Sequence, residues 1–188
     1  MDKITDEQVK QLAKDNGIDY AALKAFMEVE SGGRGFDENT GKLIIQFEPA
    51  WFRKKAPYAP SGLWRLNKVD VQTKEWAAFN DAFSKDPQAA LLTTSIGLPQ
   101  IMAFNYVQCG YRSVNDMWDD FKKGEYNQVA ALVRFIRANK KLYAALAAKD
   151  WHTVASIYNG SGYKDLARRL KREPYDKSLE KAYVKYDA

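Results

Sequence analysis

A glutamate near the end of a predicted helix is the residue whose position most directly suggests chemistry. Residues 20–31 read YAALKAFMEVES, and the apolar stripe through Leu23 and Met27 continues at helical spacing onto Glu30. The carboxyl group should therefore point inward or into a cleft. Apolar neighbours and the negative end of the helix macrodipole both disfavour its charged form, which predicts a raised pKa. A carboxylic acid that stays protonated near neutral pH can act as a general acid, for instance toward the oxygen of a leaving sugar.

A structural role for Glu30 fits the same spacing. A carboxylate in the last turn of a helix can be partly exposed, or it can accept hydrogen bonds from backbone N–H groups in the loop that follows. The pattern alone leaves both interpretations open.

Helical periodicity covers most of the sequence that must position this residue. Thr5 and Asp19 are suitable N-caps for two helices, which would end at Gly17 and at the Gly32-Gly33 pair. Further helices are predicted over 49–55, 74–85, 86–94, 113–124, 125–139, 140–149 and 151–160, with a short helix ending near Gly110 and two more toward the C-terminus.

One segment has a different pattern. An extended apolar run at 43–47 follows a turn at 39–41, which favours a short strand or hairpin and is the only β signal. Residues 56–70, which contain two prolines and a glycine, are expected to form an irregular loop. We therefore predict a mainly α fold in a single domain over residues 1–188, with one small β element near residues 36–48.

Composition narrows the possible partners. The single cysteine, Cys109, excludes an internal disulfide, and one histidine, His152, leaves no metal site of the usual ligand spacing, so we predict no metal and no cofactor. The polar first residues and the lack of an apolar segment of roughly 20 residues predict a soluble protein made in the cytoplasm, without a transmembrane segment. The net charge of +5 favours a polyanion, but the two short basic clusters do not form a nucleic-acid site.

Three segments occur in an order that resembles a known signature. They are VESGG at 29–33, SIGLPQIM at 95–102 and YNGSGY at 158–163. Together they resemble the lysozyme superfamily, particularly goose-type lysozymes and soluble lytic transglycosylases. With FE at 47–48 and the longer segments at 90–106 and 150–163, nearly the whole chain resembles the N-acetylmuramidase family found as the lytic domain of bacteriophage endolysins. Ile96 and Ala103 replace a Trp and a Gly that are usual in that family, which leaves the sugar preference of the cleft open.

The resemblance implies a lysozyme-like fold and a defined reaction. The expected reaction is hydrolysis of the β-1,4 bond between N-acetylmuramic acid and N-acetylglucosamine in peptidoglycan, with Glu30 as the general acid. A base or nucleophile must then serve the opposite face of the sugar ring. Glu48 is the first candidate, because strand alternation places it on the face of the extended run that could border a cleft. Alternatively, Glu48 forms an ion pair with Arg53 or Lys54, and Asp37 is a second candidate, although FDENTG is typical of a turn.

Five further residues are candidates for sugar binding: Ser95, Gln100, Tyr158, Asn159 and Trp64. The first four belong to the segments that carry the resemblance, and a glutamine can both donate to and accept from an amino sugar. The fifth is the one tryptophan in the irregular loop, where it could stack on a sugar. The other tryptophans fall mostly at helical spacing and are expected in the core.

Two other functions fit parts of the sequence. A lytic transglycosylase would use the same Glu30 without a second carboxylate and would leave anhydromuramic ends. A non-enzymatic module would bind cell wall or nucleic acid through its positive charge. As an endolysin, the protein is expected to bind peptidoglycan and no nucleic acid, to be a monomer, and to reach the wall from the host cytoplasm after holin-dependent release.

Overall fold

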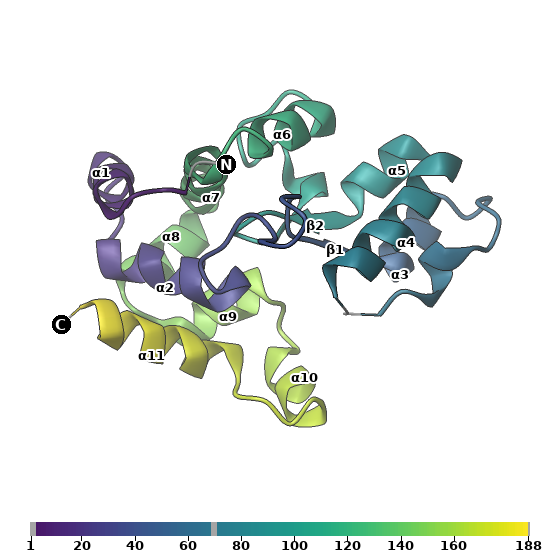
Figure 1. Cartoon of the computed structure of the whole chain (residues 1–188). Helices are drawn as coiled ribbons and strands as arrows, with labels where there is room; N and C mark the ends of the chain where they lie inside the picture. The colour runs from purple at the N-terminus through teal and green to yellow at the C-terminus, as the bar shows by residue number, and fades with distance from the viewer. Residues whose placement is uncertain (1–2, 69–70, 188) are drawn as a thin grey trace.

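The computed structural model describes residues 3–68 and 71–187 and confirms a mainly α fold (Figure 1). The helices form two groups, one containing α2, α9 and α11 and the other containing α3, α4 and α5, and the strands β1 and β2 lie between them (Figure 1). The elements are α1 Asp6–Asp15, α2 Tyr20–Ser31, β1 Ile45–Phe47, α3 Pro49–Lys55, η1 Leu63–Leu66, α4 Gln72–Lys85, α5 Pro87–Leu92, β2 Thr94–Ile96, β3 Ile101–Met102, η2 Ala103–Asn105, α6 Val114–Phe121, α7 Glu125–Ala138, α8 Lys140–Ala147, α9 Trp151–Tyr158, α10 Tyr163–Arg169 and α11 Tyr175–Tyr186.

The first two helices begin and end where the sequence predicts. Thr5 and Gln8 form a capping box at the start of α1, in which each side chain accepts a hydrogen bond from the other residue's backbone N–H. Asp19 caps α2 by accepting from the Ala22 N–H at 2.9 Å, and Gly32 ends the helix with a left-handed φ of 64°. These two signals fix the length of α2 and therefore place Glu30 in its last turn.

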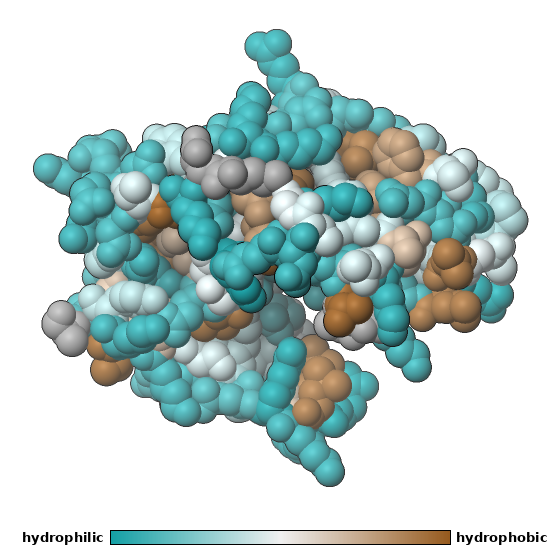
Figure 2. Space-filling model, in the orientation of Figure 1, coloured by the Kyte–Doolittle hydropathy of each residue, from teal (hydrophilic) through white to brown (hydrophobic). Residues whose placement is uncertain are grey.

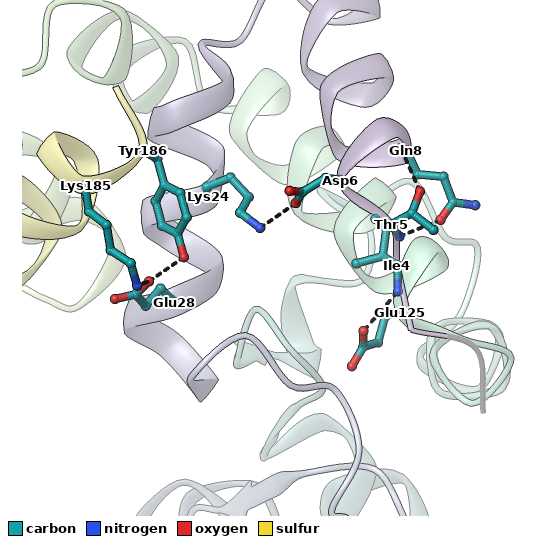
Figure 3. A network of polar contacts seen from close by, with 9 residues as sticks. All are labelled: Ile4, Thr5, Asp6, Gln8, Lys24, Glu28, Glu125, Lys185 and Tyr186. Atoms are coloured by element: carbon teal, nitrogen blue, oxygen red, sulfur yellow. Dashed lines mark hydrogen bonds and ion pairs between the residues drawn. The ribbon is translucent and has the colours of Figure 1, made fainter. Parts of the chain in front are cut away.

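Polar contacts hold α2 against its neighbours (Figure 3). Lys24 forms an ion pair of 2.8 Å with Asp6 of α1, while Glu28 accepts from Lys185 and Tyr186 at the end of α11. Most of these groups are partly exposed, so each pair contributes little free energy, and their role is to fix the relative position of the helices. Apolar packing stabilises the arrangement more, because α11 lies along α2 (Figure 1) and both contribute fully buried side chains to the core.

The small β element differs from the prediction. The extended run at 45–47 pairs not with a local hairpin partner but with β2, in the antiparallel register Gln46↔Ser95, and β2 pairs with β3 through Ser95↔Met102. The predicted local hairpin is reduced to an isolated bridge between Phe36 and Leu43. The sheet therefore has three strands in the order β1-β2-β3.

The segment after β2 corrects a second prediction. Residues 94–102 form a hairpin of β2 and β3, and the helix predicted to end near Gly110 is limited to the three residues of η2. Gly97, with a φ of 68°, makes the turn, and a Cβ there would lie 2.8 Å from both the Gln128 Oε1 and the Phe121 ring, so glycine is required. The irregular loop at 56–70 likewise contains the short helix η1, while Val69 and Asp70 lie outside the described residues.

Candidate active site

A cleft of about 1040 Å³ opens between the two groups of helices. Its walls come from the end of α2, the three strands, the start of α3, the ends of α7 and α9, and the α10–α11 region. In the space-filling view the surface is hollowed between α10 and the part that contains α3 and α4 (Figure 2). Six of the predicted site residues line this cleft: Glu30, Glu48, Ser95, Gln100, Tyr158 and Asn159.

Glu30 has the environment that the sequence predicts for a general acid. Its side chain is half-buried in the last turn of α2, and burial raises its pKa to about 7. The phenolic O–H of Tyr175 donates a hydrogen bond to Glu30 Oε1, and Arg172 adds a positive charge nearby. Both of these favour the ionised form, but burial outweighs them, so the group titrates near neutral pH.

Aromatic rings account for that burial. Tyr158 packs against Phe26, with the ring centroids 4.8 Å apart, and stacks on Tyr175 at 6.5 Å. Burial raises the pKa of both phenols well above the ordinary value, so both stay protonated and act as donors. The Tyr158 O–H donates to the Pro99 carbonyl at 2.6 Å, which joins the YNGSGY segment to the SIGLPQIM segment beside Glu30.

Glu48 follows β1 and reaches the same cleft. The predicted alternation is confirmed, because Ile45 and Phe47 are buried while Gln46 and Glu48 are half-buried and line the cleft. Burial raises the pKa of Glu48, and the Gln46 amide, which donates to Glu48 Oε1 at 2.8 Å, opposes that shift. The alternative ion pair with Arg53 or Lys54 does not form among the residues that the structure describes.

Asp37 does not lie in the cleft, so the second candidate is corrected. Its carboxylate accepts hydrogen bonds from the backbone N–H and the hydroxyl of Thr40, at 3.1 and 2.7 Å. These bonds close the turn before Leu43, as the turn interpretation of FDENTG expects.

The predicted polar contacts to sugar occupy the strands and a helix end. Ser95 lies on β2 opposite Gln46, and Gln100 has a left-handed φ of 48° in the turn that follows. The Gln100 amide donates to the carbonyls of Gly97 and Ile44, at 2.8 and 3.3 Å. Its side-chain oxygen accepts no hydrogen bond from a described residue, which leaves it available to an N–H or O–H of a sugar. Asn159, at the end of α9, is exposed on the rim.

The prediction of Trp64 as the stacking residue is wrong. Trp64 is only 3% exposed, donates its indole N–H to the Pro60 carbonyl at 2.9 Å and packs edge-on against Phe52. It does not line the cleft, because η1 turns its ring into the core. Trp51, in the first turn of α3, is 43% exposed and does line the cleft. Its proximity to Glu48 in the sequence, at a helix start marked by Pro49, is a local signal for this role.

The other candidate reactive groups have structural partners. The Cys109 thiol is buried, which raises its pKa to about 12 and makes it a poor nucleophile. His152 is exposed, and its Nδ1 lies 2.7 Å from the Tyr163 hydroxyl. Within residues 3–68 and 71–187, no three His, Cys, Asp or Glu side chains are grouped to hold a metal ion. No helix in the same residues is long and apolar enough to cross a bilayer.

Two comparisons with known proteins found similar sequences or structures. A family model described as N-acetylmuramidase matches residues 19–187. Among solved structures, the chain is similar to a Burkholderia AP3 phage endolysin, with 31% sequence identity and a TM-score of 0.79 over 98% of this chain and 71% of the endolysin chain. No curated protein matches the sequence.

Proposed function

The chain belongs to the N-acetylmuramidase family and is a peptidoglycan-degrading glycoside hydrolase, and we propose that Glu30 is its general acid. The bond cleaved is the β-1,4 bond between N-acetylmuramic acid and N-acetylglucosamine. The observation that carries this proposal is a carboxyl group with a pKa of about 7 on the wall of the large cleft. At neutral pH about half of such groups hold the proton that the glycosidic oxygen must receive.

The neighbours of Glu30 suit a proton that leaves during the reaction. Because Tyr175 donates to Oε1, the transferable proton resides on Oε2. Negative charge develops on Glu30 as the glycosidic oxygen takes this proton. The Tyr175 hydrogen bond and the Arg172 charge both stabilise that charge, so they lower the pKa of the resting acid and also stabilise the transition state.

Glu48 is the proposed second carboxylate. It lies on the strand side of the cleft, whereas Glu30 lies on the helix side, so a sugar bound between them presents opposite faces to the two groups. Glu48 acts on the anomeric carbon, directly or through a water molecule. Gln46 orients its carboxylate by donating to Oε1.

The remaining predicted contacts position the glycan. Ser95, Gln100, Tyr158 and Asn159 line the same cleft and bind hydroxyl and acetamido groups of the strand, with Trp51 in place of Trp64 as the stacking surface. The enzyme acts as a monomer on the wall, without a nucleic-acid partner. It reaches the wall after holin-dependent release from the cytoplasm of the host.

The test compares Glu30→Gln with the wild type on outer-membrane-stripped cells, following loss of turbidity and release of reducing sugar ends. We expect a decrease in rate of roughly 10²–10⁴-fold, which is the usual contribution of a general acid. Glu38→Gln, a change at an exposed surface carboxylate, is the matched control. A folded Glu30→Gln enzyme with the wild-type rate would rule out this role.

The same assay separates the two candidates for the second carboxylate. Glu48→Gln should reduce the rate strongly, whereas Asp37→Asn should leave it within about twofold of the wild type, since Asp37 lies outside the cleft. The reverse order would reject Glu48. Mass spectrometry of the products should find reducing muramic ends and no anhydromuramic ends.

A further inference from the structure

One positive charge faces the cleft. Among the described residues that line it, Arg172 is the only lysine or arginine, whereas Glu30, Glu48 and Glu173 are acidic. Of the 29 lysines and arginines in the chain, Arg172 is thus the one that lines the described part of the cleft. The side chain of Arg172 is exposed, so it is accessible to a ligand in the cleft.

The backbone holds Arg172 at this place through a defined turn. Lys171 has a left-handed φ of 51°, and its N–H bonds to the Arg168 carbonyl at 3.3 Å. The Arg172 N–H bonds back to the Ala167 carbonyl at 3.0 Å. This pair of bonds is a Schellman motif at the end of α10, although a lysine takes the position that glycine usually occupies. The chain therefore accepts a strained residue to turn Arg172 toward the cleft.

No protein carboxylate neutralises this guanidinium among the described residues. Glu173 forms an ion pair with Lys181, Glu48 accepts from Gln46, and Glu30 accepts from Tyr175. Arg172 itself forms no ion pair or side-chain hydrogen bond with a described residue. Its charge nevertheless reaches Glu30, where it favours the ionised form.

The chemistry of the substrate suggests what fills this site. The sugar rings and acetamido groups of a glycan strand are uncharged, and its carboxylates occur only on the lactyl ether of muramic acid, either free or on an attached stem peptide. A planar guanidinium binds a carboxylate through two parallel hydrogen bonds. Resting on the proposed function, we propose that Arg172 binds a carboxylate carried by the lactyl group of the muramic acid next to Glu30, and so selects muramic acid strands over uncharged glycans.

This contact also links binding to the acid. An anionic group on Arg172 cancels part of its positive charge, and Glu30 then keeps its proton to higher pH. A bound muramic acid would therefore help to protonate the residue that cleaves it. An uncharged strand bound in the same cleft would leave Glu30 more ionised.

The experiment measures kcat/KM on soluble glycan strands of two kinds, with stem peptides and with free lactyl groups after removal of the peptides. Each kind is used as prepared and after its carboxylates have been converted to methylamides by carbodiimide coupling. Charged and amidated strands with stem peptides test the carboxylates on the peptide. Charged and amidated strands without peptides test the lactyl carboxylate. The preference is the ratio of kcat/KM on charged strands to kcat/KM on amidated strands of the same kind. We expect Arg172→Gln to lower this ratio about tenfold. The decrease should appear on the peptide-bearing strands if Arg172 binds a peptide carboxylate, and on the peptide-free strands if it binds the lactyl carboxylate.

Two other variants control for charge and for fold. Arg172→Lys keeps the charge but not the planar fork, so it should retain only part of the preference. Arg169→Gln removes an equal charge from the same end of α10 at a residue outside the cleft. This variant should keep the full preference for charged strands. On amidated strands, Arg172→Gln should also move the alkaline limb of the pH profile upward, because it removes a charge that ionises Glu30.

One result would overturn the inference: an unchanged preference in Arg172→Gln on both kinds of strand, whether the rates on charged and amidated strands stay the same or fall by the same factor. Failure of the proposed function has a different signature, because a wild-type enzyme that releases no reducing ends from any of the four substrates would not be a muramidase of these strands.

Discussion

The burial of Glu30 predicts that Glu30→Gln makes the protein more stable above neutral pH. In the unfolded chain this carboxyl ionises near its ordinary pKa of 4.5, whereas in the folded protein it ionises only at about 7. Between these values the folded state binds more protons than the unfolded state. The free energy of unfolding therefore falls as the pH rises from 4.5 through 7, and the favourable contribution of the protonated group is fully present only below 4.5.

The magnitude follows from the pKa difference. Moving the pKa from 4.5 to about 7 corresponds to at most about 3.4 kcal/mol, at 1.36 kcal/mol per unit of pKa. Solvent screening reduces this, because the side chain is half-buried, so we expect about 1–2 kcal/mol at pH 8. Glutamine has the same shape, accepts the Tyr175 hydrogen bond and carries no charge. For a chain of this size, that difference raises the melting temperature by roughly 2–8 °C.

The assay is thermal and urea unfolding of the wild type and Glu30→Gln at pH 4.5 and pH 8, followed by circular dichroism. The variant should be the more stable protein at pH 8 and should gain little at pH 4.5. Glu38→Gln, at an exposed site, should differ little from the wild type at either pH. A gain of the same size at both pH values, or a less stable variant at pH 8, would refute the argument from burial.

Two further predictions concern the walls of the cleft. Tyr175→Phe removes a donor to the ionised Glu30, and because such a bond contributes roughly 1.5–3 kcal/mol, the alkaline limb of kcat/KM should move up by about one to two pH units. Tyr186→Phe, which loses a bond to Glu28 outside the cleft, should leave the limb in place. Trp51→Ala should raise KM for glycan strands by roughly 3–10-fold with little loss of stability. Trp64→Ala should instead lower the free energy of unfolding by roughly 3–5 kcal/mol, and equal stability losses in the two variants would contradict this division.

Helix positions were predictable because their signals are local. Thr5, Asp19 and the Gly32-Gly33 pair mark the ends of α1 and α2 within a few residues of the helices that they limit. The three-stranded sheet was not predictable, because β2 and β3 are only three and two residues long. Strands this short do not show a hydrophobic period of two. The pairing of Gln46 with Ser95 joins segments that no local signal connects.

The site residues also divide into those that the local sequence predicts and those that depend on the fold. The position of Glu30 follows from helical spacing, and the position of Glu48 follows from strand alternation. Tyr175 carries no local mark of its role, because it meets Glu30 only through the packing of α11 on α2. The choice between Trp51 and Trp64 also depended on the fold, since a ring in a loop can turn outward or, as in η1, into the core.

The order of the chain has a consequence for when the enzyme becomes active. Tyr175 is the first residue of α11 and lies 145 positions after Glu30. While a ribosome is still making the region before α11, α2 can form, but α11 does not yet cover its last turn, which stays open to water. Its glutamate is then ionised at the pH of the cytoplasm and cannot donate a proton. The enzyme thus gains a protonated Glu30 only after α11 has been synthesised and has packed against α2.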